Sequence, residues 1–120
     1  MPDNYIITEV EKGTIHISED VIATVVGAAL AECDGVAGLA STVGGDLTEL
    51  LGKKSVSKGI KITFEDGKIL VDVIILVHFG SNIVSVAKKV QEKIVSELES
   101  MTGLESEVNV RVSGVTFDKN

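Results

Sequence analysis

The dipeptide Asp66-Gly67 constrains the fold of this chain more than any other feature, because it stands between two segments with strand character. Residues 58–65, KGIKITFE, alternate apolar and polar side chains, whereas residues 68–78, KILVDVIILVH, are almost continuously apolar. Asp-Gly is a strong signal for a two-residue hairpin turn. Such a turn fixes the register of the strands, so that Glu65 faces Lys68 and every further pair follows from it.

This register assigns the side chains of the hairpin to two faces. The expected inner face carries three apolar cross-strand pairs: Phe64 with Ile69, Ile62 with Val71, and Ile60 with Val73. The expected outer face carries Glu65 with Lys68, Thr63 with Leu70, and Lys61 with Asp72, followed along the second strand by Ile74, Leu76 and His78. We predict that Lys61 and Asp72 form a structural ion pair contributing up to about 1 kcal/mol, in preference to an acid/base role for Asp72.

Large aliphatic residues on the outer face are the most informative part of this pattern. A free sheet surface does not normally keep residues such as Leu70, Ile74 and Leu76 in water, and a contiguous apolar patch usually marks a contact with another chain. If the alternation holds, the last strand adds Asn109, Arg111 and Ser113 to this face, and the first strand adds His16. The predicted interface consists of Leu70, Ile74, Leu76, His78 and Arg111, and the predicted partner is a second copy of the chain.

The remaining elements complete an α+β fold. We expect a strand at 14–17 and, after the N-cap Ser18, a helix at about 19–33. A second helix, with one apolar stripe, is expected at about 83–101. The last strand is expected at 107–112, followed by a bulge at Gly114. The order is β-α-β-β-α-β. It predicts a two-layer domain with a mainly antiparallel four-stranded sheet and two helices on one face.

The expected domain spans residues 14–117, between an N-terminal arm at 1–13 and a short tail at 118–120. Its segment 35–57 is rich in glycine. We expect a short helix there, at 46–51, whose leucines hold the segment over the core.

Composition and charge exclude several classes of function. The chain has 120 residues, which fits one domain, and a formal net charge of −7 with few aromatic residues, which argues against nucleic-acid binding and against direct binding to anionic membranes. Its apolar runs are shorter than the roughly 20 residues that a spanning helix needs. It shows no signal-peptide pattern, and its single cysteine, Cys33, excludes an internal disulfide. We therefore expect a cytoplasmic protein.

The sequence predicts no catalytic, cofactor or metal site. Cys33 would need a neighbouring histidine to act as a nucleophile, yet we expect it on the helical side of the sheet, away from His16 and His78. Two histidines without a third ligand make a poor metal site. The segment GGDLTELLGKKS (44–55) lacks the spacing of a phosphate-binding loop. One alternative stays open: a small-ligand site built from His16, His78, Arg111 and Asp72.

Four blocks of the sequence resemble one protein family. They are GTIHISEDVIATVVGAALAECDGVAGL (13–39), KGIKI (58–62), VDVIILVHFGSNIVSVAKKVQEKIVSELESMTGL (71–104) and VNVRVSGV (108–115). Together they resemble the alkaline shock protein family, a general-stress and envelope-stress-response family of Gram-positive bacteria. The chain differs from the family pattern at Phe79, where tyrosine is common, and at Val84, where proline is common. Both changes are conservative.

The resemblance implies an abundant, non-enzymatic, cytoplasmic protein that self-assembles. Some members are held beneath the membrane by a membrane-spanning relative, and small members without long tails tend to be encoded beside enzymes of lipid metabolism. We therefore expect an interaction or scaffold protein that contributes to cell-envelope homeostasis through a partner near the membrane. The alternative is an accessory or regulatory subunit of a lipid- or fatty-acid-metabolism enzyme.

Overall fold

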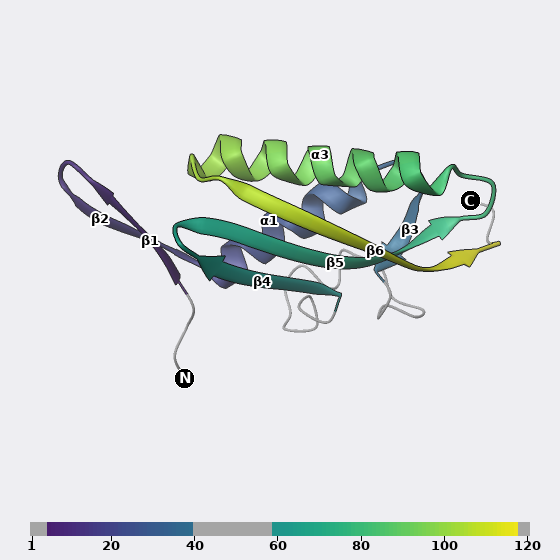
Figure 1. The fold of residues 1–120 in the computed structure, drawn as a ribbon, viewed down its shortest axis with the longest axis horizontal. Helices are drawn as coiled ribbons and strands as arrows, with labels where there is room; N and C mark the ends of the chain where they lie inside the picture. The colour runs from purple at the N-terminus through teal and green to yellow at the C-terminus, as the bar shows by residue number, and fades with distance from the viewer. Residues whose placement is uncertain (1–4, 40–58, 118–120) are drawn as a thin grey trace.

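The computed structural model describes residues 5–39 and 59–117, which form two helices and two sheets (Figure 1). The elements, in chain order, are β1 (Tyr5–Val10), β2 (Gly13–Ser18), α1 (Glu19–Ala31), β3 (Val36–Leu39), β4 (Ile60–Glu65), β5 (Lys68–His78), α3 (Ile83–Thr102) and β6 (Ser106–Thr116). The predicted helix at 46–51 lies outside the described residues, as does the tail at 118–120.

Strand β5 is the centre of the four-stranded sheet. Strand β6 pairs with it in parallel along one edge. Strands β4 and β3 pair with it antiparallel, β4 along Lys68–Val73 and β3 along Ile75–Val77. The fold is therefore α+β, as predicted, with a mainly antiparallel sheet. The one parallel pair arises because the chain crosses over from β5 to β6 through helix α3. Parallel neighbouring strands need a crossover connection of about a dozen residues or more, usually a helix.

The first strand lies elsewhere than predicted. Strand β2 was expected in the four-stranded sheet, but it pairs with β1 in a separate two-stranded hairpin that projects from one end of the molecule (Figure 1). The fourth strand of the main sheet is β3. Residues 5–10, within the predicted arm, form β1, which pairs with β2 along its whole length. The backbone N–H and C=O groups of β2 therefore find hydrogen-bond partners on β1, and β2 does not have to pair with an edge strand of the main sheet.

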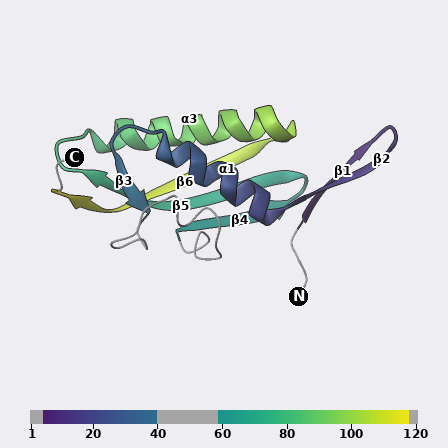
Figure 2. The same cartoon turned by 180° about the vertical axis from the view of Figure 1, so that it is seen from behind.

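The core lies between the inner face of this sheet and the two helices, which Figure 2 shows from the helical side. Helix α1 begins as predicted, with the backbone N–H of Val21 donating to Ser18 Oγ. Helix α3 begins at the N-cap Asn82 and ends at Gly103, whose φ is 74°. The buried residues of α3 form one stripe, namely Val86, Val90, Ile94 and Leu98. Ile83 and Met101 lie in the end turns of α3 and are exposed.

Candidate interaction site on the outer sheet face

The hairpin register agrees with the prediction at every position. Glu65 pairs with Lys68, Lys61 with Asp72, and Ile60 with Val73. Asp66 and Gly67 both have positive φ, 53° and 77°, as a two-residue primed turn requires. The inner-face residues of β5 are completely buried, namely Ile69, Val71, Val73, Ile75 and Val77. We define the outer face by the alternate, half-buried residues of β5, namely Leu70, Asp72, Ile74, Leu76 and His78, together with their β6 partners.

Strand β6 contributes a positive charge and a bulge to this face. Arg111 pairs with Ile74 and is exposed, as predicted. The register then shifts, so that Gly114 pairs with Leu76. Ser113 falls at the shift and has no β5 partner in the register. The predicted bulge at Gly114 is thus confirmed. A Cβ atom at Gly114 would lie 3.1 Å from Leu76 Cδ2, so the glycine leaves room for Leu76 to lie across β6.

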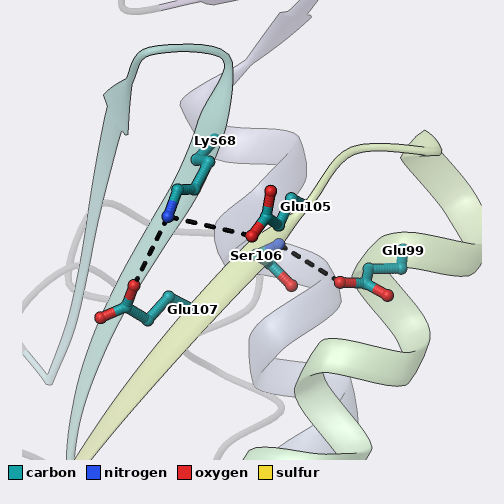
Figure 3. A network of polar contacts seen from close by, with 5 residues as sticks. All are labelled: Lys68, Glu99, Glu105, Ser106 and Glu107. Atoms are coloured by element: carbon teal, nitrogen blue, oxygen red, sulfur yellow. Dashed lines mark hydrogen bonds and ion pairs between the residues drawn. The ribbon is translucent and has the colours of Figure 1, made fainter.

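Lys61 and Asp72 lie opposite each other, as the hairpin register predicts. The ion pairs found among the described residues involve Lys68 and Lys93. The ammonium that forms ion pairs on this hairpin belongs to Lys68, whose Nζ lies 3.9 Å from Glu105 and 3.8 Å from Glu107 (Figure 3). An exposed lysine loses side-chain freedom when it is fixed on a carboxylate in water, so proximity across strands does not by itself produce a bond.

The small-ligand cluster is not assembled. His16 lies on the projecting hairpin, near Thr14 Oγ1 and the edge of the Tyr5 ring, whereas His78 ends β5 at the other end of the molecule (Figure 1). Asp72 and Arg111 lie on the outer face with His78, but His16 does not. Within residues 5–39 and 59–117, no group of three or more His, Cys, Asp and Glu side chains could hold a metal ion.

Cys33 lies just after α1, on the helical side of the sheet, as predicted. Its thiol donates to the carbonyl oxygen of Ala29 at 3.4 Å, and the side chain packs against the core. Burial raises the pKa of the Cys33 thiol; the charge of Lys93 opposes this shift, and the charge of Glu32 reinforces it.

A raised pKa predicts an unreactive thiol, because the thiolate is the nucleophile and its fraction at neutral pH falls as the pKa rises. We expect native Cys33 to react with iodoacetamide at pH 7.5 at least several-fold more slowly than the same cysteine in urea-unfolded protein. The rate should still be rising with pH above 9. Mass spectrometry of timed samples measures both rates, and equal rates in the two states would contradict this prediction.

None of the helices in the two described ranges combines the length and the hydropathy needed to cross a membrane.

Comparison with known proteins identifies the family. The model of the alkaline shock protein family, described as having a cell envelope-related function, matches residues 8–117. The chain belongs to this family. The match includes both helices, the four-stranded sheet with its outer face, and all of the β1–β2 hairpin except the first three residues of β1.

Relatives of this family member occur in Bacillus and Streptococcus. The chain is 37% identical to the uncharacterized protein YqhY of Bacillus subtilis over 88% of its own length and 79% of that protein. It is 39% identical to the uncharacterized protein YloU of the same organism and 40% identical to the uncharacterized protein Spy1614 of Streptococcus pyogenes, in each case over 86% of this chain and 88% of the relative. No solved structure matches the chain.

Proposed function

We propose that this family member is a non-enzymatic interaction protein that self-associates through the outer face and contributes to cell-envelope homeostasis under stress. The envelope-related role is that of the family. The observation that carries the self-association is the row of Leu70, Ile74 and Leu76 along β5, which alternate with the completely buried residues of the inner face.

The arrangement on this face suits a protein contact better than a reaction. Aliphatic side chains form its centre, and polar groups surround them, with Arg111 and Asn109 on β6 and Lys61 and Thr63 on β4. An apolar centre with a polar rim is the usual anatomy of a protein interface. Its single histidine, His78, lies at the end of the row.

Membrane proximity in this proposal depends on a partner. The formal net charge of −7 opposes approach to an anionic lipid surface. The polar side of α3 carries both signs, with Lys88 and Lys89 as well as Glu92 and Glu99, and therefore lacks the basic character of a membrane-binding helix. The protein would act in the cytoplasm and reach the membrane through another protein, such as a membrane-anchored relative.

Substituting Leu76 with aspartate tests the self-association. We expect the wild-type protein to show a mass above that of the monomer that increases with concentration, and Leu76→Asp to remain folded but monomeric, because a carboxylate would be desolvated in the contact. Light scattering after size-exclusion chromatography measures the mass, and circular dichroism verifies the fold. Ile74→Ser is a milder second variant if the aspartate destabilises the sheet.

The matched control is Val21→Asp, which makes the same change of charge at an exposed apolar residue in the first turn of α1. A carboxylate is favourable near a helix N-terminus, so this variant should fold and associate like the wild type. An unchanged oligomeric mass for Leu76→Asp, or dissociation by both variants alike, would contradict an interface on the outer face.

A further inference from the structure

Strand β6 forms one edge of the four-stranded sheet. Among the described strands it pairs with β5 alone. The backbone N–H of Ile69 donates to the carbonyl oxygen of Glu105, and this bond sets the phase of the parallel ladder. Because alternate residues of a strand bond to the same neighbour, residues 107, 109 and 111 face β5. The N–H and C=O groups of residues 106, 108, 110 and 112 therefore point away from the sheet.

Helix α3 satisfies some of these outward groups at the start of the edge. Gln91 Nε2 donates to the carbonyl oxygen of Val108 at 3.1 Å, and the N–H of Ser106 donates to Glu99 Oε2 at 3.4 Å (Figure 3). Both bonds involve outward residues, in agreement with the phase of the ladder. Strand β6 then diverges from α3 toward its own end (Figures 1 and 2). Beyond Val108, no described side chain bonds to the outward backbone of β6.

The edge has few of the features that protect free strand edges. Lysine, proline and bulges are the usual ones. Strand β6, SEVNVRVSGVT, contains neither lysine nor proline; its basic residue is Arg111, and its bulge lies near its end, at Gly114. Val110 and Val112 come before the bulge. Their outward N–H and C=O groups are thus available to an added strand.

An apolar row follows the inner side of this edge, and its exposure increases along the strand. Val108 is 6% exposed, the valines that follow it at alternate positions are half-buried, Val115 is 39% exposed, and Phe117 is 72% exposed. Phe117 stacks on Phe79, which is also exposed, with 4.6 Å between the ring centroids. Exposed aromatic residues are typical centres of protein contacts. The row and the free backbone are continuous, so one extended segment would contact both.

A basic side chain lies on each side of the edge. Arg111 is exposed on the outer face of β6. Lys88 precedes Gln91 by three residues on the same flank of α3, about 4.5 Å along the helix axis. Because α3 runs antiparallel to β6 and a strand advances about 3.3 Å per residue, Lys88 lies level with residues 109–110. The ion pairs among the described residues involve Lys68 and Lys93, and neither Lys88 nor Arg111 takes part in them.

The acidic residues around α3 do not cancel these two charges. Glu97 and Glu32 are held by Lys93, at 3.5 Å and 2.9 Å, on the flank of α3 that faces α1. Asp34 follows α1 and belongs to the same side. Glu92 lies one turn after Lys88, beside the part of the edge that Gln91 occupies. The free part of the edge therefore has a local basic character that matches carboxylates on an incoming segment.

We propose that the free edge of β6 binds an extended, acidic segment of another protein, which joins the sheet as an additional strand. Main-chain hydrogen bonds supply the affinity in this mode, and alternate side chains supply the specificity. The aliphatic residues of the segment pack on the apolar row, and its acidic residues reach Arg111 and Lys88. This site uses the backbone edge of β6 and is separate from the outer-face contact between copies of the chain. Because the contact is small and partly ionic, we expect weak binding that strengthens at low salt.

A synthetic peptide tests this proposal. The probe is a fluorescein-labelled peptide of alternating valine and glutamate that ends in phenylalanine, with about eight residues, an ordinary strand length. Fluorescence anisotropy should show saturable binding at low salt. N-methylation of the valine amides in one probe, and of the glutamate amides in another, blocks the two backbone edges separately. One of these probes should bind about ten-fold more weakly and the other like the parent, because only one edge of the peptide faces β6.

Two sets of protein variants locate the site. Val110→Pro removes an outward N–H and leaves the ladder with β5 intact, whereas the matched control Val110→Ala keeps this N–H. The proline variant should bind the probe about ten-fold more weakly than the alanine variant. Light scattering should give it the same mass as the wild type, and circular dichroism the same fold. Lys88→Glu with Arg111→Glu should bind a probe with lysine in place of glutamate in preference to the original one.

Four outcomes would overturn the proposal. They are the absence of saturable binding at low salt, two N-methylated probes that both bind like the parent, equal binding by the proline and alanine variants, and a proline variant of lower mass than the wild type. The last outcome would mean that this edge pairs copies of the chain. If the proline variant does not fold, the N-methylated probes give the decision with the wild-type protein alone.

Discussion

Replacing Gly35 with alanine is expected to lower the free energy of unfolding by about 2–4 kcal/mol, because two separate costs add at this position. Gly35 has a φ of 95°, which residues with a side chain rarely adopt. A Cβ atom there would also lie 2.6 Å from Val86 Cγ2, well inside van der Waals contact. Val86 is a buried residue of α3, so the added methyl group would press against the core.

The backbone around Gly35 has little freedom to move away. The carbonyl oxygen of Gly35 accepts a hydrogen bond from the backbone N–H of His78 at 3.0 Å, which fixes the residue against the end of β5. A displacement that relieved the contact with Val86 would stretch this bond and shift the start of β3. Urea unfolding followed by circular dichroism gives the free energy for both proteins.

Gly67→Ala is the matched control for this substitution. Gly67 also has a positive φ, 77°, but a Cβ atom there would have nothing within 4 Å, so only the backbone cost of about 1 kcal/mol applies. The double variant Gly35→Ala with Val86→Ala should lose less than the two single variants added together. Equal losses at Gly35 and Gly67 would show that the contact with Val86 does not contribute.

Ile94→Ala is the second substitution with a large expected effect, a loss of about 2–5 kcal/mol. The side chain of Ile94 is 0% exposed in the middle of the α3 stripe, and the deletion leaves a cavity between the helix and the sheet. Ile83→Ala removes the same atoms from the same helix where the side chain is 43% exposed, and should cost below about 1 kcal/mol. Thermal and urea unfolding measure both. Similar losses for the two variants would mean that α3 is rotated about its axis from the position described.

Local patterns in the sequence were enough to define the central hairpin and both helices. The Asp66-Gly67 turn determined every pair between β4 and β5 and thereby the outer face, because a two-residue turn leaves no freedom of register. The N-cap Ser18 was equally local, since it acts on a backbone group three residues away.

The missed features of the candidate surfaces depend on contacts between distant segments. Phe79 and Phe117 are far apart in the sequence, and their stacking follows from the parallel pairing of β5 with β6. A useful signal was present in the scarcity of aromatic residues and in the placement of these two at the ends of strands. Lys68 was assigned to Glu65 across the turn, but the start of β6 brings Glu105 and Glu107 beside it.

The sequence by itself determined the class of fold, the register of the hairpin, the buried stripe of α3 and the apolar row on β5, because each of these depends on a turn or on the period of a single element. Only the tertiary structure decided which strands are neighbours. Val36–Leu39 joined the main sheet and Gly13–Ser18 did not, and His16 and His78 were separated to opposite ends. Strand pairing is a competition among backbone edges across the whole chain, and a pattern within one segment does not contain the identity of its partner.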